Sequence, residues 1–167
     1  MAEDISYIRK WIKRGLSKDK KTLDFSNKGI DNLMAEELAE NVALPDIEIL
    51  FLHTNKIKDQ GLEDLANSEF FEPLKELWIY ENRIGDDGAE ALANSTCLKN
   101  LKALHLDANR IGFRGMQALA KLPGLKNLET LNITYNLVHP QGLSILDESE
   151  RLQNLGKVKT DILKAND

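Results

Sequence analysis

The chain has 167 residues, of which 42% are hydrophobic and 29% charged, with a formal net charge of -5. This composition is typical of one globular domain with a sizeable core. No stretch approaches the roughly 18 apolar residues of a membrane span, and no export signal is recognisable, so we expect a soluble, cytoplasmic protein. Cys97 is the only cysteine, which excludes an intrachain disulfide.

Charge is unevenly distributed along the chain. Residues 1–21 contain seven basic and three acidic residues, which leaves 15 basic and 24 acidic residues in the other 146. The net charge of -9 on this larger part disfavours nucleic acid as its partner.

The first 21 residues predict an amphipathic helix. Apolar side chains recur along one side of it at helical spacing, and the basic side chains lie elsewhere. The apolar residues are Ile5, Tyr7, Ile8, Trp11, Ile12 and Leu16. Such a helix either covers the exposed end of the core that follows or binds a membrane surface or partner.

From residue 22 onward the sequence repeats with a period of 27 residues. The stretches LFLHTNKI, LWIYENRI, LHLDANRI and LNITYNLV share the pattern apolar, x, apolar, x, x, Asn, x, apolar. They begin at Leu50, Leu77, Leu104 and Leu131. Their shared asparagines are Asn55, Asn82, Asn109 and Asn136. An earlier unit, LDFSNKGI, has Lys28 at the Asn position. We expect each stretch to form a short strand, whose Asn amide bonds backbone groups of the following turn.

The second part of each unit predicts a helix. GLEDLA, GAEALA and GMQALA place Leu and Ala at helical spacing behind a glycine. The glycines in register are Gly61, Gly88, Gly115 and Gly142. Without side chains they would let neighbouring helices approach closely. Asp31, Asp59 and Asp86 are predicted helix caps, and Pro140 suits a first helical turn.

The strand pattern followed by GxxxLA at this period resembles the leucine-rich repeat, in its ribonuclease-inhibitor-like class. The resemblance implies an α/β solenoid with a parallel sheet on the concave side and helices on the convex side. It covers residues 22–155 as five repeats. We therefore expect residues 1–21 to form a capping helix, because the first repeat has no neighbour to cover its end of the core. Residues 156–167 are expected to form a partial sixth repeat. Most proteins of this class are non-catalytic scaffolds that bind proteins, so we expect no cofactor and no enzyme activity.

Alternation along the strands predicts which side chains face the concave surface. Because neighbouring strands lie roughly 4.8 Å apart, the rings of three repeats would form one patch there. These rings belong to Phe51, His53, Trp78, Tyr80 and His105. Glu81, Asp107 and Tyr135 surround the patch in the prediction. Exposed aromatic clusters favour protein docking, so we interpret the patch as a partner-binding site.

Other interpretations stay open from the sequence alone. The neighbouring rings could serve only to stiffen the sheet by stacking on one another. The protein could instead be a structural or regulatory subunit that docks through its convex helices or its C-terminal edge. By fold analogy with the Ran GTPase-activating protein, Lys56, Arg83 and Arg110 could act on a GTPase partner.

Catalytic and metal-binding interpretations have little support in the sequence. His53, His105 and Asp107 provide a possible base and carboxylate, but the only cysteine lies elsewhere in its repeat. Two histidines in separate repeats also make a poor transition-metal site, so no metal is expected.

The C-terminal end is less defined. A sixth strand begins near Val158, and either Ile162 and Leu163 close the core or the strand edge pairs with another copy or with further chain. The protein is therefore predicted as a monomer or an edge-mediated dimer.

Overall fold

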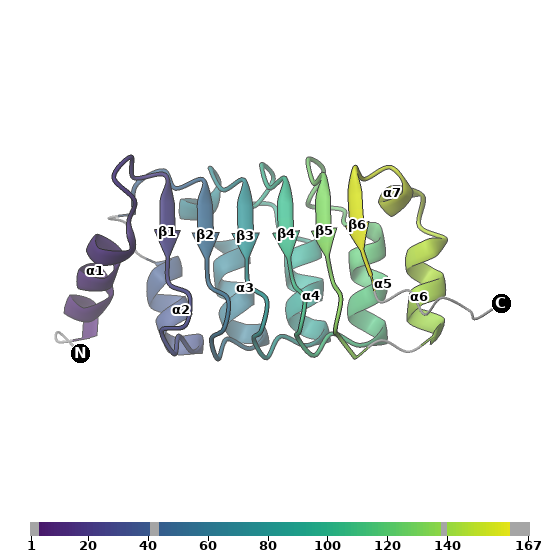
Figure 1. Cartoon of the computed structure of the whole chain (residues 1–167), viewed down its shortest axis with the longest axis horizontal. Helices are drawn as coiled ribbons and strands as arrows, with labels where there is room; N and C mark the ends of the chain where they lie inside the picture. The colour runs from purple at the N-terminus through teal and green to yellow at the C-terminus, as the bar shows by residue number, and fades with distance from the viewer. Residues whose placement is uncertain (1–3, 41–43, 138–139, 161–167) are drawn as a thin grey trace.

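The computed structural model describes residues 4–40, 44–137 and 140–160, without the side chains of residues 4–7. One six-stranded parallel sheet in the order β1 to β6 forms one layer, and helices cover one of its faces (Figure 1). The strands are β1 (Thr22–Asp24), β2 (Ile49–Phe51), β3 (Glu76–Trp78), β4 (Ala103–His105), β5 (Thr130–Asn132) and β6 (Lys157–Lys159). This arrangement confirms the predicted fold class.

Helices alternate with the strands along the chain. They are α1 (Asp4–Gly15), α2 (Asn32–Ala39), α3 (Asp59–Asn67), the 3-10 turn η1 (Glu69–Phe71), α4 (Asp86–Ala93), α5 (Phe113–Lys121), α6 (Pro140–Asp147) and α7 (Glu150–Gln153). None of the helices in the described ranges has the length and apolarity needed to cross a membrane.

Strand register follows the sequence period. Leu50 pairs with Leu77, Leu77 with Leu104, and Leu104 with Leu131. These leucines are at most 1% exposed, because alternation sends every second strand residue into the layer between sheet and helices. The resulting core is continuous through the repeats.

A turn with left-handed backbone geometry follows each of the strands β1 to β5. The residue before the recurring Asn position has φ between 52° and 59° in these five repeats, namely at Asn27, Thr54, Glu81, Ala108 and Tyr135. At the first four of these positions the backbone N–H bonds the neighbouring repeat, as in Thr54 N–H to the Tyr80 carbonyl at 3.0 Å. The left-handed conformation reverses the chain direction, so the next side chain enters the core.

That next side chain is the recurring asparagine, and it links adjacent repeats. The Asn82 side-chain amide donates to the carbonyls of Leu52 at 3.0 Å and Ile79 at 3.1 Å, and its oxygen accepts from Ile57 N–H at 2.9 Å. The set of Asn55, Asn82, Asn109 and Asn136, here called the asparagine ladder, makes equivalent bonds. Buried backbone groups of each turn thus obtain their partners from the next repeat.

The predicted helix caps are partly wrong. Asp31 caps α2 by accepting from Met34 N–H at 3.2 Å. Asp59 and Asp86, by contrast, are the first residues of their helices, and each reaches into the following repeat. Asp86 accepts there from Gly112 N–H at 2.6 Å and Gly115 N–H at 3.0 Å. The carboxylate that accepts from the first N–H groups of α5 therefore belongs to the preceding repeat, because neighbouring helices pack side by side.

Buried serines link the other ends of the helices. Ser68 donates to the Ala39 carbonyl and Ser95 to the Ala66 carbonyl, each at 2.5 Å. Leu122 occupies this position in the repeat of α5, and a backbone bond from Gly124 N–H to the Ala93 carbonyl at 2.9 Å takes its place.

The helix glycines differ in how closely they approach their neighbours. A Cβ on Gly88 would lie 2.8 Å from Asp59 Oδ1 and 3.0 Å from Asp59 Cα. Gly61 and Gly115 are similarly close to the preceding helix. The nearest atom to a Cβ on Gly142 is Met116 Cγ at 3.7 Å, so the close approach expected from the sequence is absent there.

Helix α1 lies beside β1 and α2 at the N-terminal end of the solenoid (Figure 1). Ile8 and Ile12 are buried in the shared core, and the Trp11 ring packs edge-on to Phe25 at 6.3 Å. At the other end, Val158 of β6 packs partly buried against the core. The predicted closure by Ile162 and Leu163 lies outside the described residues.

We predict that Gly88→Ala lowers the free energy of unfolding by about 1 to 3 kcal/mol, since the added methyl group would overpack the contact with Asp59. Gly142→Ala is the matched control, and we expect no change or a gain of up to about 1 kcal/mol from helix propensity. Urea denaturation followed by circular dichroism measures both. Equal losses for both variants would contradict the steric explanation.

We predict that Asn82→Ala destabilises the protein by about 3 kcal/mol or more, because the buried Ile57 N–H loses its acceptor and the carbonyls of Leu52 and Ile79 each lose one of their donors. Asn94→Ala is the control, since its exposed side chain donates to the Glu90 carbonyl of the adjoining helix, its one side-chain hydrogen bond within the described residues. That variant should change stability by no more than about 0.5 kcal/mol. Thermal and urea unfolding would show whether the two losses differ.

Candidate functional site

The candidate site lies on the face of the sheet that points away from the helices, here called the sheet face. In β2, β3 and β4 the central residue is buried and its two neighbours are half-buried on the opposite side. Phe51, Trp78 and His105 occupy the last strand position and stand opposite one another in register. His53 lies two residues after Phe51, and Tyr80 two residues after Trp78, so both share this orientation.

These five rings are in contact. Trp78 stacks on His105 with centroids 3.6 Å apart and planes at 12°, and Tyr80 stacks on His53 at 4.3 Å and 5°. Phe51 is 5.7 Å from Trp78 and 6.1 Å from His53. We call Phe51, His53, Trp78, Tyr80 and His105 together the ring cluster. The structure thus brings together five predicted site residues from three repeats.

The sequence interpretation missed one row of this face. The first residues of β2 and β3, Ile49 and Glu76, lie on the same side as Phe51 and Trp78. Trp78 donates from Nε1 to a Glu76 carboxylate oxygen at 3.2 Å, so Glu76 borders the ring cluster. Strand alternation, extended one step toward the N-terminus, would have predicted this row.

Carboxylates border the cluster on the other side as well. Glu81 accepts from the Thr54 hydroxyl at 3.0 Å, and Asp107 accepts from the Asn132 side-chain amide at 2.8 Å. Both hydrogen bonds join adjacent repeats and fix the carboxylates beside Tyr80. Among the described residues, no Lys or Arg forms a salt bridge with Glu76, Glu81 or Asp107.

Burial changes the protonation of this site. It lowers the pKa of His105, against the opposing influence of Asp107 and Glu76, and therefore favours the neutral imidazole. Burial also raises the pKa of Asp107. The pKa of Tyr80 is raised by burial and by the nearby charges of Glu81 and Asp107. The cluster therefore combines aromatic rings and an imidazole of lowered pKa at His105 with carboxylates that form no salt bridge with Lys or Arg in the described structure.

The remaining predicted residues lie at its margins. Tyr135 is at the left-handed turn after β5, two repeats beyond Glu81, and is 77% exposed. Lys56, Arg83 and Arg110 are exposed and follow the asparagine ladder in successive repeats. They form a basic row at the turns rather than part of the ring cluster.

The described residues contain no group of three or more His, Cys, Asp or Glu side chains arranged to hold a metal ion. Cys97 lies in the segment after α4, where its thiol contacts the Asn67 carbonyl at 3.3 Å. The site therefore offers rings, carboxylates and hydrogen-bonding groups on an open sheet surface.

A leucine-rich-repeat family model ("Leucine Rich repeat") matches residues 73–93 and 97–120. These segments contain β3 with α4 and β4 with most of α5, so two of the repeated units match leucine-rich repeats. The open parallel sheet with its alternating helices has the leucine-rich-repeat solenoid fold, and proteins with this fold generally bind other proteins. A comparison with curated proteins gave no match.

Solved structures similar to this chain include internalins of Listeria monocytogenes. Internalin C2 is 28% identical, with a TM-score of 0.57, over 84% of this chain and 51% of the internalin chain. Internalin InlF is 20% identical, with a TM-score of 0.30, over 74% of this chain and 49% of the other. The protein spans about half the length of these structures. The match to internalin C2 agrees with the open parallel sheet and its alternating helices.

We predict that His105 makes stability depend on pH. Its pKa is lower in the folded than in the unfolded chain, so this contribution is complete above about pH 6.5 and is lost as the pH falls through the folded-state pKa. The unfolding free energy should therefore decrease on acidification from about pH 7.5 to about pH 5.5. In His105→Gln the decrease should be smaller, because the imidazole with the lowered pKa is absent from this variant. Parallel slopes for the two proteins in urea denaturation would refute the assignment.

Proposed function

We propose that this protein is a non-catalytic interaction module of the ribonuclease-inhibitor-like class, and that its ring cluster binds a protein partner. The observation that carries the proposal is the continuous contact among five rings on the side of the sheet opposite the described helices. Rings are favoured anchors in protein interfaces because each buries a large area with few rotatable bonds. Phe51, Trp78 and Tyr80 are the proposed anchors.

Stacking within the cluster also supports this role. Each of Trp78 and Tyr80 stacks on a histidine, yet both rings remain partly exposed to solvent. Their positions are fixed by contacts across repeats, so little side-chain freedom is left to lose on binding. A rigid, partly exposed aromatic surface is therefore prepared for a partner, whereas rings that served only to stiffen the sheet could be fully covered.

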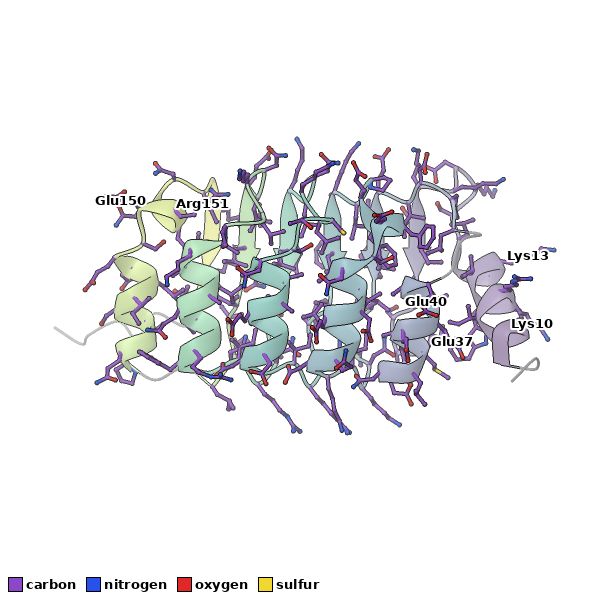
Figure 2. All side chains as sticks on the ribbon, turned by 180° about the vertical axis from the view of Figure 1, so that it is seen from behind. Lys10, Lys13, Glu37, Glu40, Glu150 and Arg151 are labelled. Carbon is purple, nitrogen blue, oxygen red and sulfur yellow. The ribbon has the colours of Figure 1, made fainter. Side chains whose placement is uncertain are left out.

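The helical face is chemically different. It carries acidic side chains on and directly after α2, namely the half-buried Glu37 and the exposed Glu40, which Figure 2 shows from behind the sheet. Among the side chains that the structure describes, the exposed aromatic residues outside the sheet face and its margins are Phe70 in η1 and Phe113 at the start of α5. These two residues provide a control for loss of aromatic surface elsewhere on the molecule.

We predict that W78A/Y80A removes partner binding while the solenoid stays folded. Trp78 and Tyr80 lie outside the buried core, so the far-ultraviolet circular dichroism should be retained. Affinity capture from a lysate of the source organism, with proteins identified by mass spectrometry, compares the wild type with W78A/Y80A and with F70A/F113A. The expected partners are retained by the wild type and by F70A/F113A and are lost with W78A/Y80A.

The converse result would favour the alternative surfaces. Partners retained by W78A/Y80A but lost with F70A/F113A would place docking on the helical side. Identical captures by all three proteins would contradict binding through the ring cluster.

A further inference from the structure

The charge around the ring cluster has one sign. Glu76, Glu81 and Asp107 come from β3, the turn after it and the segment after β4, and all three border Trp78 or Tyr80. In the repeats of β3 and β4, no strand position on the sheet face holds Lys or Arg. The nearest basic residues in the sheet are Lys157 and Lys159 of β6, two strands beyond β4, and the charge of Lys159 is the smallest of the influences on the pKa of Asp107.

Several carboxylates elsewhere on the solenoid are paired with basic side chains. Glu48 lies between Lys21 at 3.0 Å and Lys75 at 2.6 Å, and Glu72 is 2.6 Å from Lys99. In these examples a base from a neighbouring repeat balances the carboxylate. The carboxylates beside the ring cluster accept hydrogen bonds from neutral donors, which leave their charge in place.

Tyr80 has the surroundings of a cation site. His53 stacks on its ring, and the next residue in the same row of the sheet face, on the neighbouring strand, is Asp107. Glu81 follows Tyr80 directly, and the charges of both carboxylates act on the Tyr80 hydroxyl. A guanidinium or ammonium group placed here would contact a π-face and two carboxylates at once.

We propose that the ring cluster recognises a basic segment of a partner protein, with Arg or Lys side chains lying against Tyr80 between Glu81 and Asp107. This inference rests on the proposed function and adds the chemistry of the partner. Arg is favoured over Lys, since its planar group can stack on a ring while it bonds a carboxylate. Binding then depends on ionic strength, because the charges lie near the surface.

The test begins with selection from a random peptide library displayed on phage against the full-length protein. Peptides that also bind W78A/Y80A are removed by counter-selection. We expect the remaining sequences to be enriched in Arg and Lys next to apolar residues. The most enriched peptide is then synthesised, and its affinity is measured by isothermal titration calorimetry.

A matched pair of variants separates local from overall charge. E76Q/E81Q/D107N removes three carboxylate charges beside the rings, and the amides can still accept the hydrogen bonds from Trp78, Thr54 and Asn132. E36Q/E63Q/E90Q removes three exposed charges at one repeated position of the helical face. We expect the first variant to lose about tenfold in affinity and the second to match the wild type.

The possible results are distinguishable. Peptides that depend on the rings but carry no basic residues, or that bind E76Q/E81Q/D107N as tightly as the wild type, would overturn the inference and leave the proposed function intact. Selection that yields no peptide dependent on Trp78 and Tyr80 would count against the proposed function, and the inference would fall with it. Basic peptides whose affinity is lowered by E76Q/E81Q/D107N but not by E36Q/E63Q/E90Q would support both the inference and the proposed function.

Discussion

The structure depends on hydrogen bonding between the turns of adjacent repeats. After each of the three-residue strands β1 to β5 the chain enters a left-handed turn. The Leu52 carbonyl then accepts from Asn55 of its own repeat and from Asn82 of the next, and the Ile57 N–H bonds Asn82 of the next repeat. Since unpaired buried backbone groups are costly, one repeat cannot form this turn stably without its neighbour. Cooperativity between repeats therefore originates in the backbone as well as in the apolar core.

The same constraint positions the side chains of the sheet face. A fixed turn determines where the two residues before it point, and the register between strands then places equivalent side chains side by side. Trp78 meets His105, and Tyr80 meets His53, because their backbones are held by the repeats on both sides. The rings are thus positioned by the asparagine ladder and the strand pairing, and their mutual stacking follows from that placement.

Much of the architecture could be predicted because its determinants recur at one spacing. The buried leucines, the strand order and the proximity of the five rings all follow from the period of 27 residues and strand alternation. The contacts between neighbouring helices were harder to predict. Asp86 resembles a cap for its own helix, yet it serves the next one, and Gly142 repeats the Gly88 position without its close approach. Such contacts depend on side chains from two repeats, which a pattern within one repeat does not describe.

The carboxylates of the solenoid differ in whether a base is paired with them. Directly before β2 and β5, Glu48 and Glu129 are paired with lysines from adjacent repeats, so these pairs are complete within the protein. Exposed pairs of this kind contribute little stability, but they leave no strong field of one sign. Asp107 is half-buried, and burial raises its pKa, so its charged form is disfavoured where it stands. A partner cation would relieve this cost on binding, and it would do so beside rings that are already in position.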